Sequence, residues 1–274
     1  MRPFFIFLII FVLISTGIAR SQANPANTSD VLEGLFNSLV DNYNDNDRIL
    51  INDSIRTILD SYVKSDTVFN HRFPDLRYMG QITSPDSLLK IITWNLVLEN
   101  EPGRYFCYFI KKEPDGKPNK IYRLSATYNG NPVKTDTTYT ELDWYGALYY
   151  DLRPVVTAGK RCWTIVGIDY GNPEISRKVI DVLDFNSDDS IILGRKWFDA
   201  GEEKKFRVVF EYASNAMMTL RFRSDTSVIF DHLAPLSSSH KEDRQYYGPD
   251  YSFDTYDFDG EIWKLKINVD ARNK

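Results

Sequence analysis

Two different spacings of apolar residues divide the chain. Between residues 30 and 66, apolar side chains recur every three or four positions, which is the spacing of an amphipathic helix. The polar run from Asp41 to Asp47 separates two such stretches. They contain Val31, Leu35, Phe36 and Leu39, and then Ile51, Ile55, Ile58, Leu59 and Tyr62. The pattern predicts a helical hairpin within residues 24–66.

From about residue 76 onward the apolar positions repeat with a period of two, as in a strand with one buried face. The alternating stretches include 92–98, 206–212, 218–222 and 263–269, whereas 142–152 fits a strand or a short helix. The spacers are short and rich in Gly, Asn, Asp and Pro, which favours antiparallel neighbours. We therefore predict a mainly β protein with a short N-terminal helical segment and an antiparallel β-meander over 67–274. The sheet is expected to be sandwich-like or open, with a propeller-like or barrel arrangement as the alternative.

The first 23 residues have the layout of a secretory signal peptide. Arg2 precedes an apolar run from Phe4 to Ile14, and small residues follow, with cleavage sites after Ala23 or Ala19. The run is shorter than the roughly 20 residues that cross a bilayer as a helix. We therefore expect an exported protein, periplasmic or extracellular, with no stable membrane insertion after residues 1–23 are removed.

The composition fits a folded β protein and argues against one class of partner. The 274 residues include 5 Trp, 17 Tyr and 17 Phe, and aromatic side chains favour sheets. With 33 Lys and Arg against 38 Asp and Glu, the net charge is −5. Because affinity for nucleic-acid phosphates comes from clustered positive charge, we expect no nucleic-acid partner.

The two cysteines, Cys107 and Cys162, both lie in strand-like stretches. In an oxidising compartment they can form a disulfide, or they can remain two separate buried thiols. The bond depends on whether the two Cβ atoms face each other, so the sequence leaves both alternatives open.

Several stretches of the β region resemble a family of exported proteins from Gram-negative bacteria. The similarity covers residues 75–265 and includes WYGALYY at 144–150, FRVVFEY at 206–212 and VIFDHLAP at 228–235. The family's Gly-Trp-Asp-Gly-like turn corresponds to Gly167–Gly171, with Ile168 in place of Trp. The family has no assigned activity, so the resemblance implies export and transfers no catalytic residue.

The histidines form no recognisable catalytic motif. Asp231 and His232 are adjacent on a predicted strand, so their side chains point to opposite faces and cannot easily hydrogen-bond each other. His240 follows the serines 237–239, but no Gly-x-Ser-x-Gly elbow exposes a nucleophile. We therefore expect no catalytic residue and favour a non-enzyme. The alternative is a secreted hydrolase whose acidic residues assemble from distant positions.

Acidic residues near the C-terminal end are the remaining candidates for metal binding. Asp257 and Asp259 stand at alternate positions before Gly260, and Ca²⁺ prefers carboxylate oxygens. Aligned on Gly260, however, an EF-hand loop has Thr255 at position one and Lys266 at position twelve. We expect no cofactor, with Ca²⁺ at Asp257 and Asp259 as the weaker alternative.

Tyrosines in the same polar stretch are the candidate ligand-binding residues. They are Tyr246, Tyr247, Tyr251 and Tyr256. Tyrosine is both apolar and hydrogen-bonding, so these rings can stack on a sugar, anchor a protein interface or cover the end of a sheet. The sequence therefore predicts an exported binding or structural β domain with a protein or glycan partner.

Overall fold

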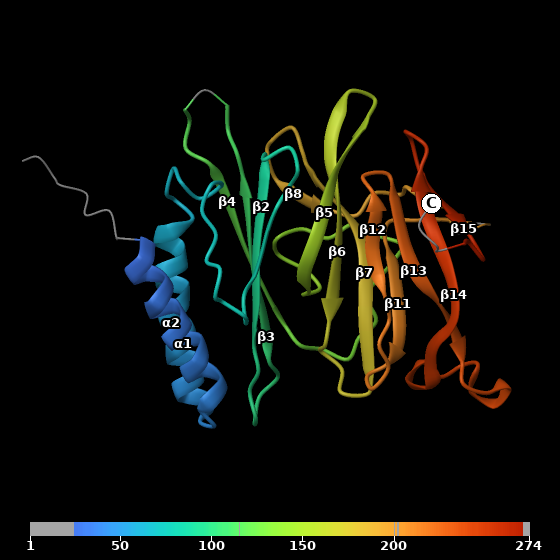
Figure 1. Ribbon diagram of the computed structural model, residues 1–274, viewed down its shortest axis with the longest axis horizontal. Coiled ribbons are helices and arrows are strands. Elements are labelled where there is room, and N and C mark those ends of the chain that lie inside the picture. The colour runs from blue at the N-terminus through green and yellow to red at the C-terminus, as the bar shows by residue number, and fades with distance from the viewer. Residues whose placement is uncertain (1–24, 115, 200, 202, 271–274) are drawn as a thin grey trace, which may run out of the picture.

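The computed structural model describes residues 25–114, 116–199, 201 and 203–270. The predicted signal peptide, residues 1–23, lies outside these ranges. In the part that is described, a pair of helices precedes a series of strands in three sheets (Figure 1). No helix in this part of the chain is long and apolar enough to cross a membrane.

The predicted helical pair is present at the N-terminal end. The helices are α1 (Pro25–Asp41) and α2 (Asp45–Tyr62). The side chain of Asn44 caps α2 by accepting hydrogen bonds from the backbone N–H groups of Asn46 and Asp47. This cap is the reason why α2 begins in the Asn/Asp-rich stretch.

The first sheet lies next to the helices and has the order β1-β2-β3-β4, with every pair antiparallel. Its strands are β1 (Gly80–Thr83), β2 (Leu89–Leu96), β3 (Arg104–Lys111) and β4 (Lys120–Thr127). Each strand pairs with the next in the sequence, as the meander prediction requires.

The second sheet has the order β11-β7-β6-β5, and β8 also pairs with β7. Its strands are β5 (Leu148–Thr157), β6 (Lys160–Asp169), β7 (Ile175–Phe185), β8 (Ile191–Leu193) and β11 (Val208–Ala213). Because β5 begins at Leu148, the ambiguous segment 142–152 is a loop that runs into a strand.

The third sheet has the order β10-β9-β15-β14-β13-β12. Its strands are β9 (Phe198–Asp199), β10 (Lys204–Lys205), β12 (Leu220–Ser224), β13 (Ser227–Pro235), β14 (Tyr247–Phe258) and β15 (Trp263–Lys266). Two short 3₁₀ helices, η1 (Ser238–His240) and η2 (Arg244–Tyr246), lie between β13 and β14. One pair departs from the antiparallel prediction, because the two-residue β9 runs parallel to β15.

Helices and sheets stack as four layers that enclose three hydrophobic cores (Figure 1). Trp94 belongs to the core under the helices, Phe109 to the core between the first and second sheets, and Trp263 to the core between the second and third. The sandwich-like architecture is thereby confirmed. The prediction of one exposed face per strand is wrong for β2 and β3, whose residues are buried on both faces because a layer covers each side.

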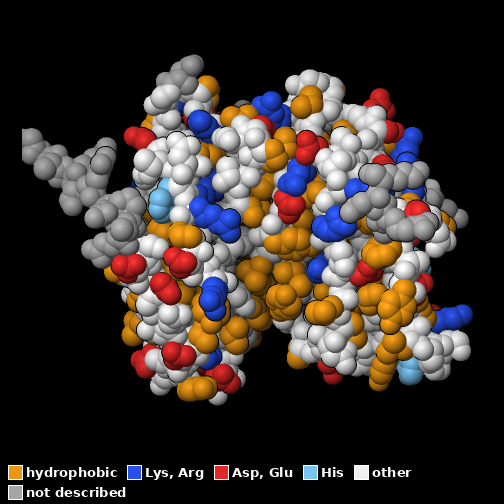
Figure 2. All heavy atoms as spheres, viewed as in Figure 1, with side chains coloured by type: hydrophobic (Ala, Val, Ile, Leu, Met, Phe, Trp, Pro, Cys, Tyr) orange, Lys and Arg blue, Asp and Glu red, His pale blue; other side chains and the backbone are white. Residues whose placement is uncertain are grey.

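The outer surface follows this layering. Figure 2 shows hydrophobic side chains gathered in a surface recess between the end of the molecule that carries the helices and the end formed by the third sheet. Comparison with Figure 1 places this recess over the lower ends of the second sheet's strands. The layers therefore do not form one flat outer wall.

The possible disulfide is not formed in this structure. Cys107 and Cys162 are both free and buried. Cys107 belongs to the core between the first and second sheets, and Cys162 to the core on the other side of the second sheet. Burial raises the pKa of the Cys107 thiol and raises that of Cys162 to about 12. The two residues are thus separate core thiols.

Candidate functional site

The four candidate tyrosines do not form one aromatic platform. Tyr247 and Tyr256 are buried in the third core, whereas Tyr246 is 37% exposed and Tyr251 is 94% exposed. Tyr246 stacks on the ring of His240, with centroids 4.1 Å apart. Tyr251 has a φ of 71°, which interrupts the regular alternation of β14. Two of the four rings therefore belong to the core.

Tyr256 nevertheless borders a groove of about 310 Å³ between the second and third sheets. Strands β11, β13, β14 and β15 and the short helix η2 contribute to its walls. Phe210, Phe230 and Leu233 supply apolar surface. The ionisable groups of the lining are Glu211, Asp231, His232, Arg244 and Asp254. This groove brings apolar and titratable side chains together from distant parts of the chain.

A histidine–carboxylate pair lies in the wall of the groove. His232 Nδ1 is 2.8 Å from Asp254 Oδ2, and the other carboxylate oxygen accepts a hydrogen bond of 3.0 Å from the backbone N–H of Asn268. Asp254 is buried, while the imidazole of His232 is 44% exposed. Since a carboxylate accepts at Nδ1, the neutral ring presents Nε2 as an acceptor. Nε2 has no hydrogen-bond partner among the described residues.

The pair lies beside an irregularity between β13 and β14. Asp254 is the cross-strand partner of Phe230, which places it diagonally opposite His232. Beyond Asp231 the register shifts, and the additional residues of this bulge are on β14. Asp231 itself accepts a hydrogen bond of 2.6 Å from the backbone N–H of Thr219. The adjacent Asp231 and His232 thus have different partners, as their positions on a strand predict.

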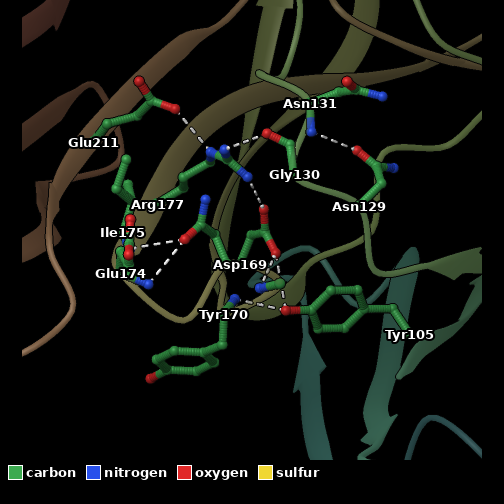
Figure 3. A network of polar contacts seen from close by, with 12 residues as sticks. Tyr105, Asn129, Gly130, Asn131, Asp169, Tyr170, Glu174, Ile175, Arg177 and Glu211 are labelled. Carbon is green, nitrogen blue, oxygen red and sulfur yellow. Dashed lines mark hydrogen bonds and ion pairs between the residues drawn. The ribbon is translucent and has the colours of Figure 1, made fainter. Parts of the chain in front are cut away.

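Glu211, at the opposite wall, belongs to a buried network that joins two sheets (Figure 3). Arg177 Nε donates to Glu211 Oε1 at 2.8 Å, and Arg177 Nη1 donates to Asp169 Oδ2 at 3.2 Å. The hydroxyl of Tyr105, on β3, donates to Asp169 Oδ1 at 2.9 Å. Arg177 is 2% exposed. The network compensates the charge of Glu211 and limits its movement.

The segment Gly167–Gly171, which was predicted to be a turn, consists of the end of β6 and the loop after it, and supplies the centre of this network. The backbone N–H of Gly171 donates to Asp169 Oδ1 at 2.7 Å. A Cβ atom on residue 171 would lie 2.9 Å from the same oxygen, so glycine is required for this approach. Sequence reasoning singled out this segment but missed Arg177 and Glu211, because their contacts cross between strands.

The two carboxylates considered for Ca²⁺ binding form ion pairs with lysines. Asp257 Oδ2 lies 2.8 Å from Lys266 Nζ, and Asp259 Oδ2 lies 2.8 Å from Lys264 Nζ. Backbone N–H groups, first that of Ile262, together with Lys264, lower the pKa of Asp259 well below its usual range. Over the described ranges no group of three or more His, Cys, Asp or Glu side chains is arranged to hold a metal ion. The two carboxylates are therefore placed as ion-pair partners of β15.

The serine run lies elsewhere on the surface. Ser237 Oγ is 2.9 Å from His240 Nδ1, within an exposed turn that includes η1. Within the part of the chain that is described, no carboxylate hydrogen-bonds His240. The contact is local to the turn and does not form a triad.

Comparisons of this chain with protein-family models, with curated proteins and with solved structures give no match. The resemblance to exported Gram-negative proteins therefore stays a prediction.

Proposed function

We propose that the chain is an exported binding protein whose ligand occupies the groove between β11 and the β13–β14 pair. The observation that supports this most directly is that apolar and ionisable side chains from separate strands converge in this groove. Ligand sites typically combine an apolar lining with a few placed polar groups. The groove has this combination, with Phe210 as apolar wall and His232 as polar group.

The lining favours a saccharide as the ligand. Glu211, Asp231 and Asp254 bring three carboxylates, against the single permanent cation Arg244. Carboxylates accept hydrogen bonds from hydroxyl groups, and aromatic side chains offer apolar contact area. Because Glu211 is paired with Arg177, the lining keeps Asp231 and Asp254 against Arg244. A glycan rich in hydroxyl donors suits this wall better than an anionic ligand.

Glycan-array binding of the chain without residues 1–23 tests the proposal. His232→Ala removes a half-exposed side chain from the groove, and we expect it to lower binding by about tenfold, the loss of one good hydrogen bond at a desolvated site. Tyr251→Ala is the matched control, because this ring is 94% exposed and does not line the groove. Unchanged melting curves would verify that both variants fold.

Loss of binding in Tyr251→Ala with full binding in His232→Ala would move the ligand out of the groove, to the exposed surface around Tyr251. Absence of glycan binding by the unmodified chain would reject the saccharide proposal.

One observation favours hydrolysis as a second function. Asp254 orients His232 with Nε2 free, which is the arrangement of a general base. The groove lining contains no Ser, Thr or Cys among the described residues, so the base would take a proton from water rather than from a side-chain nucleophile. The resulting hydroxide would attack the electrophilic carbon of the substrate. The bond from that carbon to the leaving oxygen or nitrogen would break, and the proton held on Nε2 would pass to the leaving group.

Turnover of ester, glycoside and peptide substrates measures this second function. His232→Gln should abolish any turnover while keeping a side chain of similar size. Retention of turnover in His232→Gln, or none with the unmodified chain, would reject it.

A further inference from the structure

A second hollow, of about 300 Å³, lies between the first and second sheets, away from the groove described above. The end of β3, the β5–β6 hairpin and the turn after β7 surround it, and these segments meet at the upper edge of the molecule in Figure 1. Trp163 and Phe185 supply its apolar lining. Their rings pack edge to face, with centroids 5.9 Å apart, which gives the hollow a rigid floor.

The side chains that line this hollow carry a net positive charge, whereas the chain as a whole is negatively charged. Four cations line it, against the two carboxylates Asp184 and Asp189, whereas the whole chain has a net charge of −5. The cations are Lys111, Lys112, Lys160 and Arg161. Such a concentration of positive charge in an acidic protein attracts anions to this hollow rather than to the surface in general.

Three of the four cations have a carboxylate partner, and for two of them this partner belongs to the lining. Lys111 Nζ lies 2.7 Å from Asp189 Oδ1, and Lys160 Nζ lies 2.9 Å from Asp184 Oδ1. These pairs neutralise both carboxylates of the lining. Lys112, which has no ion pair within the described ranges, and the terminal nitrogens of Arg161, whose Nε faces Asp86, are the donors left for an anion.

Lys112 and Arg161 keep donors unused. Lys112 Nζ has no hydrogen bond or ion pair within the described ranges and lies 5.7 Å from the centre of the Phe69 ring. Arg161 is held through Nε, 3.3 Å from Asp86 Oδ2, and its two terminal nitrogens have no partner in the part of the chain that is described. A guanidinium fork of this kind matches two oxygens of a phosphate or sulfate group.

We propose that this hollow is a binding site for a small phosphate or sulfate ester. Arg161 donates through its terminal nitrogens to the oxyanion, Lys112 supplies the second charge, and Trp163 and Phe185 pack against the apolar part of the ester. The site is separate from the saccharide groove, so either one can be disproved without the other.

Calorimetric titration of the chain without residues 1–23 tests the site with three probes at constant ionic strength. Phenyl phosphate and phenyl sulfate carry the oxyanion on an aromatic body, and phenol lacks the charge. We expect at least one ester to bind and phenol not to bind. Arg161→Gln and Lys112→Gln should each weaken binding of that ester by at least about tenfold, since each removes a charge-assisted hydrogen bond.

Arg221→Gln is the matched control, because Arg221 is an exposed cation on β12 with no ion pair among the described residues. It removes the same charge without touching the hollow, and binding should be unchanged. Preference for one ester over the other identifies which oxyanion the site takes. The proposal is overturned if neither ester binds at millimolar concentration, if phenol binds equally, or if Arg221→Gln weakens binding as much as the two test variants.

Discussion

Asp181 and Arg207 form an ion pair in which neither side chain is exposed. Arg207 Nε lies 2.8 Å from Asp181 Oδ2, and the relative exposure of both side chains is 0%. Arg207 also donates to the backbone carbonyls of Thr137 and Leu193, at 2.8 and 2.9 Å. This guanidinium therefore joins the long segment between β4 and β5 to the second sheet, together with the backbone hydrogen bonds between Tyr139 and Leu193.

Removing this guanidinium should destabilise the fold strongly. Arg207→Met removes the cation that pairs with the Asp181 carboxylate and a donor to the carbonyls of Lys134, Thr137 and Leu193. Breaking a buried pair from one side costs about 3–5 kcal/mol. Arg104→Gln is the control, because its pair with Glu101 is exposed and worth about 0–1 kcal/mol. Urea unfolding measures both changes. Equal effects of the two substitutions would contradict the role given to Arg207.

Gly194 is expected to be intolerant of a side chain for two independent reasons. Its φ is +104°, and an added Cβ would lie 2.5 Å from Arg207 Nη2. Gly194→Ala should therefore lower the free energy of unfolding by more than about 2 kcal/mol. Gly116→Ala shares the positive φ, at +72°, but meets no atom within 4 Å, so only about 1 kcal/mol is expected. Similar unfolding midpoints for the two variants would show that the contact with Arg207 does not matter.

The free energy of unfolding should increase as the pH rises from 8 to 10, because the pKa of Lys90 is lowered in the folded protein. Burial, and then the charge of Arg72, lower the pKa of Lys90 from 10.5 to about 8. The ammonium donates to the carbonyls of Val68 and His71 and to the hydroxyl of Tyr62. Between these pH values the unfolded chain binds more protons at this site than the folded chain does, so the free energy of unfolding increases with pH, by roughly 2 kcal/mol.

Denaturant unfolding at several pH values measures this slope. Other groups also titrate in this range, so the informative quantity is the difference between the unmodified chain and Lys90→Met. We expect the variant to lose the Lys90 part of the slope. Parallel stability curves for the two proteins would exclude this linkage.

The two cysteines should behave as inert thiols in the folded protein. Burial keeps the pKa values of Cys107 and Cys162 above that of a free thiol, so little thiolate is present at neutral pH. We expect slow reaction with a thiol reagent in the native state and two reactive thiols after unfolding. The melting temperature should not change with reductant. Finding no thiol in the unfolded protein would establish a disulfide instead.

Local pattern was sufficient to predict the elements and much of their order. Helical spacing over 30–66 and a period of two beyond residue 76 depend on which side chains share one face of an element, and that is a local property. Short polar spacers likewise predicted antiparallel neighbours, because they are too short for crossovers. The helical pair and the meander in the structure therefore follow from the sequence.

What covers each face was decided only by the tertiary structure. The period of β3 separates Cys107 from its neighbours Phe106 and Tyr108, but it does not show that helices cover one side and a second sheet the other. For this reason the prediction of exposed strand faces was wrong for inner strands, and the cysteines lie in different cores.

The two candidate sites were likewise decided by the tertiary structure and not by local pattern. His232 meets Asp254 across the pairing of β13 with β14, and Arg161 reaches its hollow only because the β5–β6 hairpin stands beside the end of β3. Contacts of this kind arise when separate elements pack, and their energy depends on distances that no local pattern encodes. The amino-acid order determines the strands and their faces, while the stacking of the four layers determines which side chains meet.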